Sequence, residues 1–120
     1  MASTRGLDPR YEPIAQQLLA HLKTLAGGFV ITSGLRSHDD QVRLYNKFLA
    51  GGSGVYTVLP PGRSQHERGL AVDIARIGTE PKQDPILRAV GAWWRSQGGV
   101  WGGDADPVHF EATRAWTGRS

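Results

Sequence analysis

The sequence contains no cysteine in its 120 residues. A disulfide framework and a thiolate metal site are therefore both excluded, so any metal ion must be held by nitrogen and oxygen ligands. Because no thiol is present, the sequence does not indicate whether the protein works in a reducing or an oxidising compartment.

Long apolar runs are also missing from the sequence. No stretch reaches the roughly 20 apolar residues that span a bilayer, so we expect no membrane insertion. The first ten residues are polar and include Pro9, unlike the apolar segment of a secretory leader. We therefore expect no signal peptide in this chain.

The positive charge of the chain is not gathered into a basic patch. A net charge of +3 and a pI of about 9.7 favour attraction to polyanions, which include nucleic acid, membrane surfaces and anionic cell walls. However, the Lys and Arg residues are scattered and are not interleaved with aromatic residues, as they are in many nucleic-acid-binding proteins. We therefore predict that nucleic acid is not a partner.

The composition is typical of one compact domain. Hydrophobic residues make up 39% of the chain and charged residues 21%, which provides enough apolar surface for a single core. We predict one domain over residues 1–120, with loose ends at about residues 1–8 and 113–120.

Three segments have the apolar spacing of amphipathic helices. The first runs from Glu12 to Ala26 and stops at a pair of glycines. The second follows Ser37 and Asp40, which resemble a capping box, and the third opens at Asp84 and stops at another glycine pair. The apolar sides of the second and third helices contain Val42, Tyr45 and Leu49, and Ile86, Val90, Trp93 and Trp94.

Four short runs rich in β-branched and aromatic residues predict strands at residues 29–32, 70–77, 100–101 and 108–112. Residues 51–63 are rich in Gly, Ser and Pro, which predicts a loop long enough to be functional. The helices and strands follow no βαβ rhythm and no repeat. These features predict an α+β fold, with a mainly antiparallel sheet and helices packed on it.

Alternation along two of these strands separates a polar face from an apolar face. Asp73 points away from the side of Val72, and His109 points away from the side of Phe110. If the two strands are neighbours, Asp73 and His109 converge, and His66 lies only seven residues before Asp73. Two imidazoles and a carboxylate can supply the three protein ligands of a catalytic zinc site. On spacing alone, each of the three could also be an ordinary solvated or hydrogen-bonded residue.

Three ordered motifs stand out in the sequence. Residues 33–37 read SGLRS, residues 64–73 have the form SxHxxGxAxD, and residues 106–109 have the form DxxH, followed by Phe-Glu. Together these motifs resemble the M15 family of zinc peptidases, which includes VanY-like D-Ala-D-Ala carboxypeptidases and the L-alanyl-D-glutamate endopeptidases of phage lysins. The resemblance covers about residues 29–111 and implies a hedgehog/DD-peptidase-like fold.

The resemblance also implies roles for individual residues. It implies a Zn²⁺ ion held by His66, Asp73 and His109, with Asp106 as the catalytic base. Arg36 would act on the substrate, because its guanidinium stays charged and can stabilise an oxyanion or hold a peptide carboxylate. The further substrate contacts that we expect are Gln41, Ser64 and Trp101.

Some of these assignments have alternatives. Ser64 could form a hydrogen bond to the side of a metal ligand that faces away from the metal, or it could simply cap its loop. Trp101 could belong to the core. Glu111 could orient one of the histidines or lie exposed at the end of its strand. Asp104 is a second candidate for the base, but it lacks the three-residue offset to His109.

Different motifs indicate different substrates. Residues 61–66 resemble the carboxypeptidase branch of the family, whereas residues 106–111 resemble the endopeptidase branch. We predict an L-alanyl-D-glutamate endopeptidase of peptidoglycan stem peptides, because the base motif is closest to the chemistry, with a D-alanyl-D-alanine carboxypeptidase as the alternative. A domain that binds zinc or wall peptides without cleaving them, and a metal-free virion subunit, are alternatives of other classes.

The resemblance also suggests where the protein works. We expect a monomer that acts at the bacterial cell wall. Without a signal peptide, it would be a phage lysin, a virion-associated enzyme or an excised domain of a secreted protein.

Overall fold

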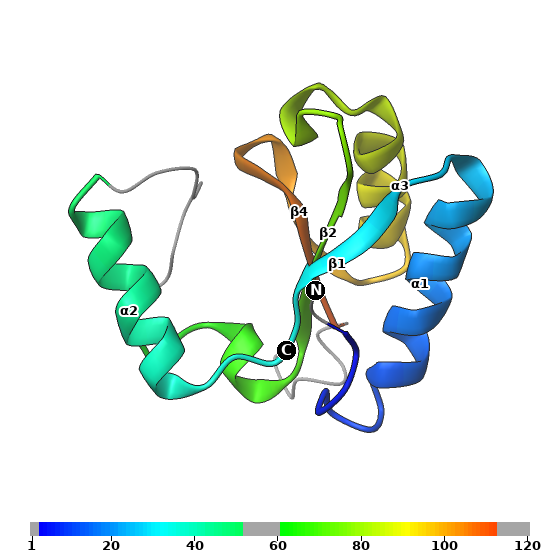
Figure 1. The fold of residues 1–120 in the computed structure, drawn as a ribbon. Helices are drawn as coiled ribbons and strands as arrows, with labels where there is room; N and C mark the ends of the chain where they lie inside the picture. The colour runs from blue at the N-terminus through cyan, green and yellow to red at the C-terminus, as the bar shows by residue number, and fades with distance from the viewer. Residues whose placement is uncertain (1–2, 52–60, 113–120) are drawn as a thin grey trace.

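The computed structural model describes residues 3–51 and 61–112 (Figure 1). The helices are α1 (Glu12–Leu25), α2 (His38–Leu49) and α3 (Pro85–Ser96). The strands are β1 (Phe29–Ser33), β2 (Ala71–Arg76), β3 (Val100–Gly102) and β4 (Asp106–Glu111). Short 3-10 helices cover Gln65–Arg68, Pro81–Gln83 and Gly103–Ala105.

The four strands form one antiparallel sheet in the order β1-β2-β4-β3. Helices α1 and α3 pack on one side of this sheet, whereas α2 extends away from it (Figure 1). The prediction of an α+β fold with a mainly antiparallel sheet is confirmed. Within the described residues, no helix has the length and apolar character needed to cross a bilayer.

The starts of two helices follow local sequence signals. Ser37 Oγ accepts a hydrogen bond from Asp40 N at 3.1 Å, as expected at the start of α2. Helix α3 begins at Pro85, whose fixed φ suits a first turn, and the Asp84 side chain accepts a hydrogen bond from Ile86 N at 3.0 Å. These starts depend on residues that are close in sequence, which is why the sequence predicts them well.

The apolar side chains of the strands fill the space between the sheet and the helices. Val72 and Ile74 of β2 and Phe110 of β4 are completely buried. Because successive side chains of a strand point to opposite faces, Asp73 and His109 lie on the other face of the sheet. The core residues that α1 and α3 contribute include Leu18, Leu22, Leu87, Val90 and Trp94.

The N-terminal segment is packed, contrary to the predicted loose end over residues 1–8. Thr4 and Leu7 are buried, and Asp8 N donates to Gly69 O at 2.9 Å. The apolar side chain of Leu7 joins the core, so the segment is held from within as well as through its backbone. Residues 1–2, the predicted loose end at 113–120 and most of the predicted loop at 51–63 lie outside the described residues.

Two positions on predicted apolar helix sides are exposed. Trp93 is 46% exposed on the outside of α3, where its ring lies 5.7 Å from that of His21. The neighbouring Trp94 is buried and donates through Nε1 to Glu111 O at 2.7 Å. Leu49 is 63% exposed, because α2 lies away from the core and its apolar spacing does not mark a core-facing side.

The Asp84 carboxylate is completely buried and links α3 to β2. Its two oxygens accept hydrogen bonds from Arg76 at 2.9 and 3.1 Å, and Oδ1 also caps α3. Replacing Asp84 with Ala is expected to lower the free energy of unfolding by about 2–4 kcal/mol, because it removes a helix cap and the partner of a partly buried guanidinium. Urea denaturation measures this loss.

The matched control is Asp104→Ala. The Asp104 side chain is 80% exposed and lies 3.8 Å from Arg88, so its removal is expected to leave the urea midpoint unchanged. An equal loss of stability in the Asp84 and Asp104 variants would contradict the role given to Asp84.

Candidate metal centre

Two adjacent strands and the turn before them bring His66, Asp73 and His109 together. Strand β2 pairs with β4 so that Asp73 lies directly opposite His109. His66 lies in the 3-10 helix before β2, which ends at Gly69 with a φ of +70°, a conformation that favours glycine. A Cβ at Gly69 would also lie 2.8 Å from Asp8 N, so the turn has no room for a larger residue.

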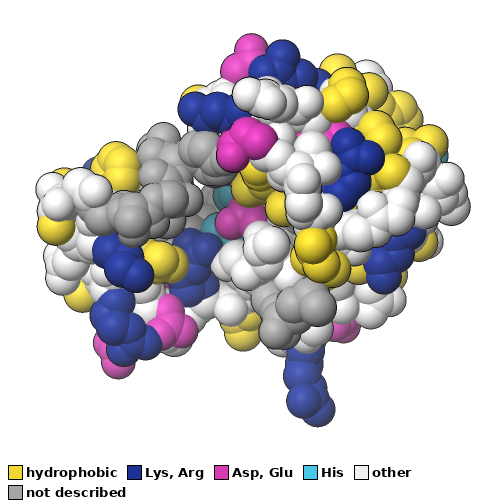
Figure 2. All heavy atoms as spheres, turned by 45° about the horizontal axis from the view of Figure 1, so that its top comes forward, with side chains coloured by type: hydrophobic (Ala, Val, Ile, Leu, Met, Phe, Trp, Pro, Cys, Tyr) yellow, Lys and Arg dark blue, Asp and Glu magenta, His cyan; other side chains and the backbone are white. Residues whose placement is uncertain are grey.

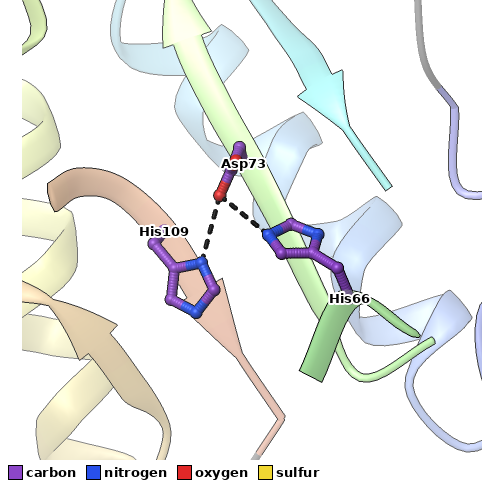
Figure 3. A group of neighbouring side chains, drawn as sticks. All are labelled: His66, Asp73 and His109. Carbon is purple, nitrogen blue, oxygen red and sulfur yellow. Dashed lines mark hydrogen bonds and ion pairs between the residues drawn. The ribbon is translucent and has the colours of Figure 1, made fainter. Parts of the chain in front are cut away.

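The Asp73 carboxylate is the centre of this cluster (Figure 3). Its Oδ1 atom lies 3.2 Å from His66 Nε2 and 3.1 Å from His109 Nδ1. One ligand atom from each residue lies within 4.8 Å of the other two, a spacing at which the three can share one metal ion. Two imidazole nitrogens and one carboxylate oxygen are a donor set that zinc accepts, with a fourth position left for water.

Other oxygens hold the remaining ring nitrogens of both histidines. His66 Nδ1 lies 2.9 Å from Gly34 O, to which it can only donate, so Nε2 faces Asp73. His109 Nε2 lies 3.0 Å from Glu111 Oε1. Such contacts orient the rings toward a metal and set their tautomers. Of the two alternatives for Glu111, the structure has the one in which it contacts a histidine, whereas a backbone contact such as that of Gly34 has no sequence signal.

The cluster attracts positive charge. Burial of Asp73 opposes its ionisation, but hydrogen bonds from His109 and His66 outweigh this effect and hold the pKa of its carboxyl well below its usual range. Burial of His109 favours its neutral ring, but hydrogen bonds with Asp73 and Glu111 raise its pKa to about 10. The positive charge can be a proton or a metal cation, and the two compete for the same ring nitrogen.

Arg36 extends toward the same cluster from the segment between β1 and α2. Its Nη2 atom lies 3.9 Å from Asp73 Oδ2 and donates to Ser33 Oγ at 2.6 Å. Its Nη1 atom donates to Gln41 Oε1 at 2.8 Å. Burial lowers the pKa of Arg36, but a guanidinium stays charged. Gln41 is itself 1% exposed, so the structure places it as a support of Arg36 and not at the open surface.

Asp106 is half-buried at the start of β4, three residues before His109. Burial and the negative charge of Asp73 raise the pKa of Asp106 to about 6, although the positive groups of the cluster act in the opposite direction. A carboxyl group with this pKa exchanges protons close to neutral pH, as a general base requires. The alternative candidate, Asp104, is exposed and pairs with Arg88.

Two predicted substrate contacts, Trp101 and Ser64, form hydrogen bonds within the protein. Trp101 is buried on the core face of β3, opposite Phe110, and its Nε1 donates to Pro107 O at 2.8 Å. The prediction that Trp101 lines the substrate cleft is therefore corrected to its alternative as a core residue. Ser64 Oγ accepts a hydrogen bond from His66 N at 3.2 Å, so Ser64 caps the 3-10 helix, whereas its contact with the substrate stays a prediction.

The centre consists of two histidines and an aspartate, and other oxygens of the protein orient the two imidazoles. With Arg36 and Asp106 beside it, this centre has the parts of a zinc-dependent hydrolase. The family model described as VanY, D-alanyl-D-alanine carboxypeptidase, matches residues 4–95. The chain therefore belongs to this family of zinc-dependent peptidases. The match ends before Asp106 and His109, whose places beside the centre come from the pairing of β4 with β2.

Solved structures of peptidases have the same fold. VanYB in complex with D-alanine-D-alanine has a TM-score of 0.67 and 21% identity, and the match covers 94% of this chain and 78% of that chain. The L-Ala D-Glu endopeptidase ChiX of Serratia marcescens has a TM-score of 0.59 and 26% identity, and the match covers 96% of this chain and 86% of that chain. A vancomycin-resistance D,D-pentapeptidase VanY mutant in complex with Zn(II) has a TM-score of 0.65 and 22% identity, and the match covers 88% of this chain and 72% of that chain. A search of curated proteins found no match.

Proposed function

We propose that the protein is an L-alanyl-D-glutamate endopeptidase that hydrolyses peptidoglycan stem peptides, with zinc held by His66, Asp73 and His109. The observation that carries this proposal is the place of Asp106, which is half-buried beside the centre and has a pKa raised to about 6. A site that only binds metal or peptide has no need of such a proton acceptor.

The proposed mechanism divides the chemistry between the metal and two side chains. When bound, zinc lowers the pKa of a coordinated water to about 7 and polarises the scissile carbonyl. Asp106 accepts the proton of the attacking water and later gives it to the leaving amine. Arg36 donates to the carbonyl oxygen as negative charge develops there, and its bonds to Ser33 and Gln41 hold it in place beforehand.

The choice of the endopeptidase rests on the motif at residues 106–111, which resembles that branch of the family. ChiX, an L-Ala D-Glu endopeptidase, supports this choice with 26% identity over 96% of this chain. The second candidate is a D-alanyl-D-alanine carboxypeptidase, which the family model and the VanYB complex favour. We propose a phage lysin or virion-associated enzyme as the biological setting, since the endopeptidase branch includes phage lysins.

Mass spectrometry of digested peptidoglycan tests the proposal. The zinc-loaded protein is expected to release fragments with a new N-terminal D-glutamate. Release of free D-alanine alone would contradict the proposal and would show that the protein is a D-alanyl-D-alanine carboxypeptidase. If neither product forms while one zinc ion per chain is present, the domain is a binding protein.

The segment that leads into Asp106 is tightly fitted. The Arg95 guanidinium lies 4.9 Å from the centre of the Trp101 ring, and its Nη2 donates to Trp101 O at 3.1 Å. A Cβ on Gly102 would lie 2.1 Å from Asp106 O, so the backbone at Asp106 would have to move. We expect Gly102→Ala to lower kcat by roughly 100-fold, the loss that a displacement of about 1 Å in a catalytic group can cause. Steady-state kinetics with a stem peptide measure kcat.

The matched control for Gly102→Ala is Gly27→Ala. A Cβ on Gly27 would have no atom within 4 Å, so this variant is expected to keep the wild-type kcat. Both variants are expected to keep their zinc, because neither change touches a ligand. An unchanged kcat in Gly102→Ala would show that the position of Asp106 does not limit the reaction.

A further inference from the structure

A groove of about 460 Å³ lies between α2 and the end of β1. One wall is formed by the end of β1 and the segment after it, which includes Ser33 and Gly34. The other wall is a side of α2 that carries charged residues. The mechanism proposed above uses only Arg36 and Ser33 from this groove, so the α2 wall has no assigned role.

The α2 wall is one continuous helix face. Asp40, Arg43, Leu44 and Lys47 follow the spacing i, i+3, i+4 and i+7, which places them in a row along the helix. Since an α-helix rises about 1.5 Å per residue, this row is about 10 Å long, the length of about three extended peptide residues. A short stretch of peptide therefore fits along it.

The groove has an excess of positive charge. Arg36, Arg43 and Lys47 line it together with one carboxylate, that of Asp40. Asp40 forms an ion pair with Arg43. Within residues 3–51 and 61–112, Lys47 has no carboxylate partner. An anionic group in the groove would therefore meet the charge of Lys47, which no carboxylate of the described residues balances, beside the ion-paired Arg43.

The groove adjoins the metal centre. The Gly34 carbonyl in its wall contacts His66 Nδ1, and Arg36 lies 3.9 Å from Asp73. Figure 2 shows Lys and Arg side chains over α2 beside the hollow in which histidine side chains are visible. A peptide whose scissile bond lies at the centre can therefore extend its neighbouring residues along the groove.

We propose that this groove binds a free carboxylate of the stem peptide, that of D-glutamate, through Arg43 and Lys47. This inference rests on the proposed function, because it takes the stem peptide as the substrate. D-Glutamate keeps one carboxylate outside the peptide linkage, whereas the amidated residue D-isoglutamine carries a neutral carboxamide there. The cations attract the first group much more strongly than the second, so the groove discriminates between the two forms.

Binding of two peptides that differ only in this carboxylate tests the inference. The zinc-loaded Asp106→Asn protein, which is expected to cleave at least about 100-fold more slowly than the wild type, is titrated calorimetrically with the D-glutamate and D-isoglutamine forms of one tetrapeptide. In this background, Lys47→Glu is expected to weaken binding of the D-glutamate form by roughly 10-fold and that of the D-isoglutamine form by less than about twofold. Lys47→Arg is expected to keep the preference.

The control for the charge change is Lys23→Glu, on the exposed surface of α1, which is expected to leave both affinities unchanged. The inference is overturned if Lys47→Glu weakens both peptides equally, or neither of them, or if the parent protein binds both forms equally well. Failure of the proposed function would appear separately, as a wild-type enzyme that releases no fragment with N-terminal D-glutamate. The titrations still test the groove in that case.

Discussion

Replacing His66 with alanine is expected to remove zinc and peptidase activity together. In the proposed zinc site the His66 side chain supplies one of the three ligands, and it is almost completely buried, so we expect no other group to take its place. Losing a residue that only orients a ligand typically costs 10- to 100-fold in metal affinity, and losing the ligand itself should cost more. Activity should fall by at least about 1000-fold, because both water activation and carbonyl polarisation depend on the metal.

Elemental analysis of the dialysed protein and a peptide-cleavage assay measure the two losses. The matched control is His21→Ala, which removes an exposed histidine whose ring lies beside that of Trp93 and is expected to keep full zinc content and activity. Circular dichroism checks that both variants are folded. A His66→Ala protein that retains one zinc ion per chain and its activity would show that the metal is held elsewhere.

Replacing Asp106 with asparagine is expected to keep the zinc and to lower kcat by about 10²- to 10⁴-fold. Asparagine has nearly the same size as aspartate, so the packing at the start of β4 is preserved, but its amide cannot accept the proton of the attacking water. Asp104→Asn is the control, because Asp104 is exposed and is expected to be dispensable. Full activity in Asp106→Asn would assign the base to another residue.

The pH dependence of the wild-type enzyme gives a second measurement of the same role. Asp106 must be ionised to act as a base, and burial with the nearby Asp73 charge raises its pKa to about 6. As the pH falls through this pKa, Asp106 becomes protonated and kcat/KM falls. A bound zinc ion favours the ionised form, so the acid limb is expected at or below about pH 6. The acid limb should be absent from the residual activity of Asp106→Asn.

The elements of the fold that depend on neighbouring residues were predictable from the sequence. Helix α3 begins where Asp84 and Pro85 predict it, because cap and first turn are made by adjacent residues. The side of a helix that is buried was harder to predict. Trp93 and Trp94 are adjacent in a helix, and only the position of α3 on the sheet determines that Trp94 is inside and Trp93 outside.

The predicted site separates in the same way. The motifs and the strand alternation indicated His66, Asp73 and His109, which the structure brings together. For Trp101 the sequence left two roles open, because a residue near the loop of Asp106 can face either the cleft or the core. The pairing of β3 with β4 places it on the core face, opposite a buried residue.

By itself, the sequence determined that any metal here must be bound without thiolates, and that Asp73 and His109 lie on the polar sides of their strands. Only the tertiary structure decided that these strands are neighbours with Asp73 opposite His109, that Gly34 and Glu111 hold the imidazoles, and that burial raises the pKa of Asp106. The physical reason is that strand register and burial arise from contacts between residues far apart in the chain. A slip of one residue in the register would turn Asp73 or His109 toward the core.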